Sequence, residues 1–121
     1  MRIDVHSGIA VDASQIETQY DADDGLPKLT LGDAQAIVLT ASVYGNGILF
    51  SRARELRLNG YTGSICLKGP ILPDQLHMAR GAGANTIEPS EQITARTPIE
   101  SWKTAASRYK TSYRTLLQLS A

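Results

Sequence analysis

The stretch "SICLKGPILPDQLHMARGAGANTIEP", residues 64–89, contains the pattern that decides the fold. The apolar run SICLKG (64–69) predicts one strand, and NTIEP (85–89) predicts another. Between the two runs, apolar residues recur at the spacing of an amphipathic helix: Leu72, Leu76 and Ala79. Gly81 and Gly83 end this helix before the second strand begins.

The preceding segment repeats the same order. AIVLTAS (36–42) is apolar, rich in β-branched residues and uncharged, so it predicts a buried strand. A glycine-rich turn follows, and then ILFSRARELRLNG (48–60) predicts a helix that ends at Asn59-Gly60. Apolar strands that alternate with amphipathic helices indicate an α/β fold. We therefore expect residues 36–90 to form a small parallel sheet from consecutive β-α-β-α-β units flanked by helices, flavodoxin-like or similar to part of a (β/α) barrel.

The two ends of the chain are less regular in pattern. Residues 97–117 predict a C-terminal helix, because Thr97-Pro98-Ile99-Glu100 forms a capping-box pattern and an apolar stripe follows. Aromatic residues in that stripe belong either to the core or to a homodimer or partner interface: Trp102, Tyr109 and Tyr113. Residues 1–34 predict an irregular N-terminal segment, in which IDVHSGIAV is compatible with a strand or hairpin. We expect residues 1–121 to form a single α/β domain.

Composition restricts the classes of function. The chain has 121 residues, of which 42% are hydrophobic and 20% are charged, as in ordinary globular proteins. Twelve basic residues balance twelve acidic ones, so net charge gives no support to a nucleic-acid or anionic-membrane partner. The lone Cys66 cannot form an internal disulfide, and no apolar run approaches the ~20 residues that span a bilayer. These features predict a cytoplasmic protein.

A ligand site is expected where the strands end. In open α/β sheets and barrels, ligands bind outside the carboxyl ends of the strands. The polar residues expected along this edge are Ser42, Tyr44, Asn46, Lys68, Gly69, Asp74, Gln75, Glu88 and Ser90. Lys68 there either binds an anion or reaches solvent. For Asp74 the alternative is a favourable interaction with the start of the helix, and Gly69 could serve only the backbone.

Motifs for familiar chemistry are not found in the sequence. GNG (45–47) is too short for a dinucleotide fingerprint, and no phosphate-binding loop of the G-x-x-x-x-G-K-[ST] type exists. Mid-strand Cys66 is more typical of a small buried hydrophobe than of a nucleophile. The two histidines, His6 and His77, have no neighbours at metal-ligand spacing, so no metal site is expected. The cofactor, if one is used, is unknown, and no catalytic residue is identified.

Four short motifs arrive in a fixed order: SRARELR (51–57), GYTG (60–63), GPILPDQ (69–75) and GANTIE (83–88). With them the chain resembles a proteobacterial family of uncharacterised proteins that carries a domain of unknown function. Members are encoded beside assimilatory sulfite reductase and are sometimes labelled oxidoreductases. The residues that match well are Ser51, Arg54, Arg57, Asp74 and Gln75. A family arginine is replaced here by Cys66, and a family cysteine by Ala82.

The resemblance implies an accessory protein of sulfite reduction and sulfur assimilation. Such a protein would act by binding a partner, with sulfite reductase as the first expectation, or a small anion at the carboxyl edge of the sheet. The candidate ligand-binding residues are Asn46, Ser51, Lys68, Gly69, Asp74 and Gln75. The alternative is a small oxidoreductase that uses a borrowed or unrecognised cofactor, with Lys68, Asp74 and Gln75 at its site.

Overall fold

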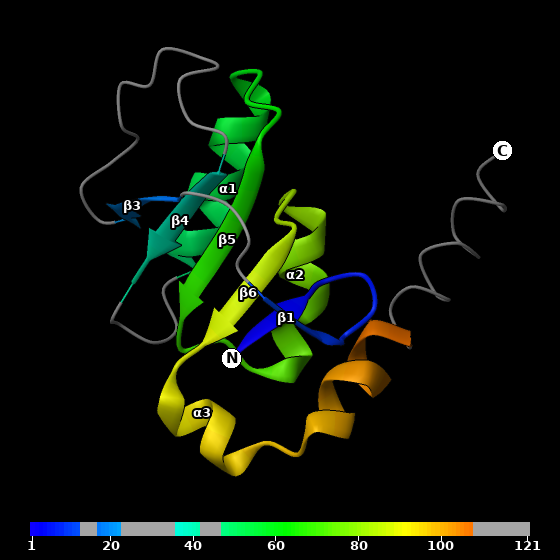
Figure 1. Ribbon diagram of the computed structural model, residues 1–121. Helices are drawn as coiled ribbons and strands as arrows, with labels where there is room; N and C mark the ends of the chain where they lie inside the picture. Colours follow the sequence, from blue (N-terminus) through cyan, green and yellow to red (C-terminus); the bar gives the residue numbers. More distant parts are fainter. Residues whose placement is uncertain (13–16, 23–35, 42–46, 108–121) are drawn as a thin grey trace, which may run out of the picture.

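The computed structural model describes residues 1–12, 17–22, 36–41 and 47–107 (Figure 1). Within them the strands and helices, in chain order, are β1 (Arg2–Asp4), β2 (Ala10–Val11), β3 (Thr18–Asp21), β4 (Ala36–Thr40), α1 (Ile48–Leu58), β5 (Ser64–Gly69), the 3-10 turn η2 (Pro73–Gln75), α2 (Leu76–Gly81), β6 (Thr86–Pro89) and α3 (Glu91–Arg96). Residues 99–107 are also helical.

The described strands form one mixed sheet in the order β2-β1-β6-β5-β4-β3. β3 to β6 run parallel to one another, whereas β1 is antiparallel to both β6 and β2. The predicted β-α-β-α-β unit is therefore confirmed, and its strands follow one another in the sheet without a reversal of order. A flavodoxin-like arrangement, which requires such a reversal, is not confirmed.

The N-terminal segment contributes more to the sheet than its sequence suggests. Its described part contains β1, β2 and β3. β1 and β2 pair antiparallel, as the hairpin interpretation of IDVHSGIAV expects, whereas β3 comes from residues that we expected to be irregular. β1 and β2 have only three and two residues, too few for a periodic pattern to be visible in the sequence. β1 lies beside β6, where Ile3 is paired with Ile87.

One face of the sheet packs against α1 and α2, which Figure 1 shows together behind the strands. Alternate strand residues and the apolar stripes of the two helices form one buried cluster there, which includes Ile37, Leu39, Ile65, Leu67, Ile87, Leu49, Ala53, Leu56, Leu76 and Ala79. Val38 and Cys66 belong to the opposite face, because side chains alternate along a strand, yet each is only 1% exposed. Burial on both faces explains why these strands read as unbroken apolar runs.

The C-terminal part differs from the prediction in two respects. An additional helix, α3, lies between β6 and the predicted C-terminal helix, and the latter is helical from residue 99. The Thr97 hydroxyl donates a hydrogen bond to the carbonyl oxygen of Ile93 at 2.6 Å, at the end of α3. Its hydroxyl therefore serves the end of one helix, and not the start of the next as the capping-box pattern predicted.

Trp102 is in the core. Its side chain is 0% exposed within the buried cluster, as the core interpretation of the aromatic stripe expects. Gly8, at φ +72°, brings the turn after β1 directly against this helix, since a Cβ there would lie 2.3 Å from the carbonyl oxygen of Trp102. Tyr109 and Tyr113, the other two candidates for a partner interface, lie outside the described residues.

Candidate functional site

The predicted site residues are divided among three parts of the molecule. Lys68 lies on the sheet face away from α1 and α2, because its neighbour Leu67 points into the helix-covered core. Asp74 lies in η2, and Ser51 lies on the exposed side of α1. Asn46, Ser42 and Tyr44 lie outside the described residues. The sequence therefore located the strand ends, but Lys68, Asp74 and Ser51 do not come together in one site as expected.

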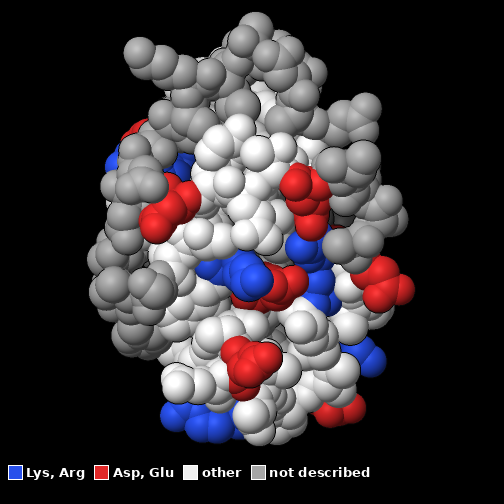
Figure 2. Space-filling view, turned by 60° about the vertical axis from the view of Figure 1, so that its left-hand side comes forward, with Lys and Arg blue, Asp and Glu red and all other residues white. Residues whose placement is uncertain are grey.

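Lys68 is engaged in a row of ion pairs across its face of the sheet. Its Nζ lies 3.2 Å from Glu88 Oε2, and Glu88 Oε1 lies 3.6 Å from Arg2 Nη2. Arg2 Nη2 also donates a hydrogen bond to Glu17 Oε1 at 2.9 Å, and this bond raises the pKa of Arg2. Figure 2 shows basic and acidic side chains in contact near the centre of the side it views. Because Glu88 compensates its charge, Lys68 is a poor candidate for holding an anion.

Cys66 lies on this same face and is almost fully buried. Burial raises the pKa of its thiol, and a hydrogen bond with Thr86 and the nearby Arg2 charge oppose that rise in part. A buried thiol with a raised pKa is a poor nucleophile. The structure thus agrees with the interpretation of Cys66 as a small buried hydrophobe.

Gly69 and Gln75 serve the turn between β5 and α2. The carbonyl oxygen of Gly69 accepts hydrogen bonds from the backbone N–H groups of Ile71 and Ser90, both at 2.9 Å. A Cβ on Gly69 would lie 2.7 Å from the backbone oxygen of Ala41, so glycine is required for close approach and not for an unusual φ. The side-chain oxygen of Gln75 accepts the backbone N–H of Leu72 at 3.0 Å. Both residues therefore have structural roles.

Asp74 lines a groove on the surface of the described residues, which we call the edge groove. It has a volume of about 440 Å³ and is lined by Leu72, Pro73, Asp74, Glu100, Ser101, Thr104 and Ala105. η2 follows the carboxyl end of β5, and the helical residues 99–107 form the other wall. Glu100, Ser101 and Thr104 were missed by the sequence analysis, because Glu100 had been assigned to a helix cap.

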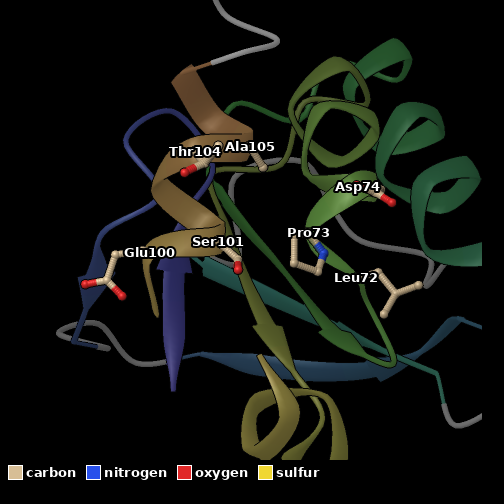
Figure 3. A pocket seen from close by; sticks show the side chains of 7 residues that line it. All are labelled: Leu72, Pro73, Asp74, Glu100, Ser101, Thr104 and Ala105. Carbon is tan, nitrogen blue, oxygen red and sulfur yellow. The ribbon is translucent and has the colours of Figure 1, made fainter. Parts of the chain in front are cut away.

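Figure 3 shows how the side chains of the edge groove are arranged. Glu100 and Asp74 lie at opposite ends of the row in that view, with Ser101 and Pro73 between them. The two carboxylates point away from each other, so they do not converge on one cation. Among the described residues, no three His, Cys, Asp or Glu side chains are close enough together to hold a metal ion. The groove instead has two separate carboxylates, beside the hydroxyls of Ser101 and Thr104 and a short apolar surface.

Another groove, which we call the helix groove, lies between α1 and α2. It has a volume of about 360 Å³ and is lined by Phe50, Ser51, Arg54, His77, Met78, Gly81 and Ala82. Ser51 is the only predicted ligand-binding residue among these. The sequence contains no local signal for the groove, because its two walls are separated along the chain by β5.

Arg57 joins three of the four motifs that carried the family resemblance. Its guanidinium donates hydrogen bonds to the carbonyl oxygens of Tyr61, Gly63 and Gly83 at 2.8 to 3.0 Å, and to the side-chain oxygen of Asn85 at 2.9 Å. It also lies 5.7 Å from the centre of the Tyr61 ring. Burial lowers the pKa of Arg57 and raises that of Tyr61. The motifs GYTG and GANTIE thus meet in a structural clamp around the guanidinium of Arg57.

The comparisons with known proteins give one match. The sequence model of a family described as "Bacterial protein of unknown function (DUF934)" matches residues 14–119. No curated protein and no solved structure matches the chain. None of the helices in the described residues has the length and apolarity needed to cross a bilayer.

Proposed function

The chain belongs to this bacterial family of unknown function, DUF934, and from that premise we propose that it is a non-catalytic accessory protein that binds a partner protein through the edge groove. The observation that carries the proposal is the pair of exposed carboxylates, Asp74 and Glu100, at opposite ends of a groove of about 440 Å³. The groove lies at the carboxyl end of β5, near the edge where the sequence placed a site.

Charge favours a basic segment of a partner over a small anion. Each carboxylate of the edge groove would repel sulfate or phosphate, and the nearest predicted cation, Lys68, is already paired with Glu88. Two separated carboxylates suit a partner segment with two Lys or Arg side chains, because each basic side chain can form an ion pair with a different carboxylate. Ser101 and Thr104 offer hydroxyls, and Leu72 and Pro73 an apolar surface, for the residues between those two basic side chains.

We further propose that the partner is sulfite reductase, in the cytoplasm, because the family resemblance implies that association. The test is capture of purified sulfite reductase subunits by the immobilised protein, measured by biolayer interferometry. Asp74→Asn combined with Glu100→Gln should weaken capture about two- to thirtyfold, because each exposed ion pair contributes roughly 0.2–1 kcal/mol. Glu91→Gln, which removes an exposed carboxylate from α3, is the matched control and should leave capture unchanged.

Two results would count against the proposal. Equal capture by the wild type and the double variant would show that the edge groove is not part of the interface. If the immobilised protein does not capture sulfite reductase, sulfite reductase is not its partner. A rise in melting temperature with sulfate or phosphate that is lost in Lys68→Ala would instead support the small-anion version.

A further inference from the structure

The three arginines of α1 are in different situations. Arg52 donates a hydrogen bond to the carbonyl oxygen of Ala22 at 2.9 Å and pairs with Glu55 at 3.1 Å. Arg57 is held by the four hydrogen bonds of its clamp. Arg54 is exposed and makes no hydrogen bond or ion pair with any residue that the structure describes. It is therefore the guanidinium of this helix that is available to a ligand.

Arg54 lines the helix groove, where its surroundings are partly apolar. The Phe50 ring is half-buried at one wall, and the Met78 side chain is 43% exposed at the other. A Cβ built on Gly81 would meet nothing within 4 Å, so this end of the groove is open. Ser51 contributes a hydroxyl beside Arg54. The helix groove thus combines a guanidinium, a hydroxyl, an aromatic ring and a thioether in one depression.

We propose that the helix groove binds an acidic segment of a partner protein, with a carboxylate on Arg54 and an adjacent apolar side chain between Phe50 and Met78. A guanidinium binds carboxylates through two parallel hydrogen bonds, and Ser51 can donate a third. Methionine adapts its shape to varied apolar side chains, which suits a peptide contact. The site is distinct from the edge groove, whose two carboxylates select the opposite charge.

An acidic peptide fits this groove better than a free inorganic anion. The polar side chains that line the groove are Ser51, Arg54 and His77, and Arg54 supplies the one guanidinium among them, whereas a fully desolvated phosphate carries a larger negative charge and accepts more hydrogen bonds than a single carboxylate does. The apolar walls would contribute nothing to a phosphate, but they can bury a leucine-sized side chain next to a carboxylate. The expected ligand of the helix groove is therefore a peptide segment in which Asp or Glu neighbours an apolar residue.

The test uses the full chain and a fluorescein-labelled peptide of alternating leucine and glutamate as the probe, with fluorescence anisotropy as the measurement. Arg54→Ala should weaken binding about two- to fivefold, as expected for loss of one ion pair at an exposed site. Arg54→Lys should recover part of the affinity, since it retains the charge without the planar fork. Arg96→Ala, an exposed arginine on α3, is the matched control and should bind as the wild type does.

The same probe separates this inference from the proposed function. The double variant Asp74→Asn with Glu100→Gln should bind the acidic peptide as well as the wild type, because it alters only the edge groove. Equal binding of an alternating leucine–glutamine peptide would overturn the inference, since the carboxylate would then have no role. Binding that is unaffected by Arg54→Ala would also overturn it, and circular dichroism of each variant confirms that it is folded.

Discussion

The guanidinium of Arg57 and the side-chain oxygen of Asn85 lie 2.9 Å apart, although 28 positions separate them in the sequence. The same side-chain oxygen of Asn85 also accepts a hydrogen bond from the backbone N–H of Ile65 at 2.9 Å. In return, the backbone N–H of Asn85 donates a hydrogen bond to the carbonyl oxygen of Ile65. The contact therefore ties the end of α1 to the beginnings of β5 and β6. It fixes how the helix and the two strands lie relative to one another.

Arg57→Ala should lower the free energy of unfolding by about 2–4 kcal/mol, because it leaves three carbonyl oxygens and the Asn85 amide oxygen without their charged donor. Urea denaturation followed by circular dichroism measures the change. Arg54→Ala, on the same helix, is the matched control and should change stability by less than about 0.5 kcal/mol. Equal effects of the two substitutions would show that the clamp is not a major source of stability.

Gly69→Ala should destabilise the protein by about 1–3 kcal/mol, because the added Cβ would lie 2.7 Å from the Ala41 backbone oxygen and 3.2 Å from Leu49 Cδ1. Gly81→Ala is the control for adding the same methyl group. It lies in α2 with open space around it, so it should stabilise the protein by roughly 0.5–1 kcal/mol through helix propensity. Thermal melts of both variants give the comparison. A neutral Gly69→Ala would mean that the end of β4 can move away from β5.

Gln75→Ala should cost about 0.5–2 kcal/mol, since it removes the acceptor for the Leu72 N–H at the start of η2. Gln75→Glu keeps an oxygen in place and should retain most of that stability. Lys68→Ala, by contrast, removes only a half-exposed partner of Glu88 and should change stability by about 1 kcal/mol or less. Urea midpoints rank the three variants. A Gln75→Ala protein as stable as the wild type would contradict the capping role.

Stability should decrease at alkaline pH, and Cys66 should account for part of the decrease. Burial raises the pKa of its thiol above the ordinary value of 9.0, so the unfolded chain releases this proton at a lower pH than the native protein does. Between the two pKa values the unfolded state binds fewer protons, and the free energy of unfolding therefore falls as pH rises. Its contribution is fully present below pH 9.0 and is lost as pH rises through the native pKa.

Cys66→Ala should make the dependence of stability on pH shallower above pH 9.0. Tyr61, whose pKa burial also raises, should leave a remaining slope at still higher pH. Urea midpoints measured across the alkaline range for both proteins test this. Identical slopes would show that the native protein ionises Cys66 as easily as the unfolded chain does.

The β-α-β-α-β unit was predictable because its signals are local. AIVLT and SICLKG are strand-length apolar runs, and the stripes of α1 and α2 recur at helical spacing, so neighbouring residues alone reveal the elements. The bounds of β5 agree with the prediction at both ends. For β1 and β2 the sequence indicated only a strand or hairpin without bounds, because two or three residues cannot establish a period. The place of β1 in the sheet depends on pairing with β6, which lies far away in the sequence, and β2 joins the sheet through β1.

The candidate sites required the tertiary structure for the same physical reason. Sequence alone determined which residue types stand at the carboxyl ends of the strands, since strand ends can be located from the pattern. Only the fold decided that Lys68 pairs with Glu88 on one face, that Asp74 and Glu100 lie at opposite ends of one groove, and that Ser51 and Arg54 line a groove together with residues of α2. Charge compensation and groove formation arise between elements that the chain separates by many residues, and such contacts leave no periodic trace in the sequence.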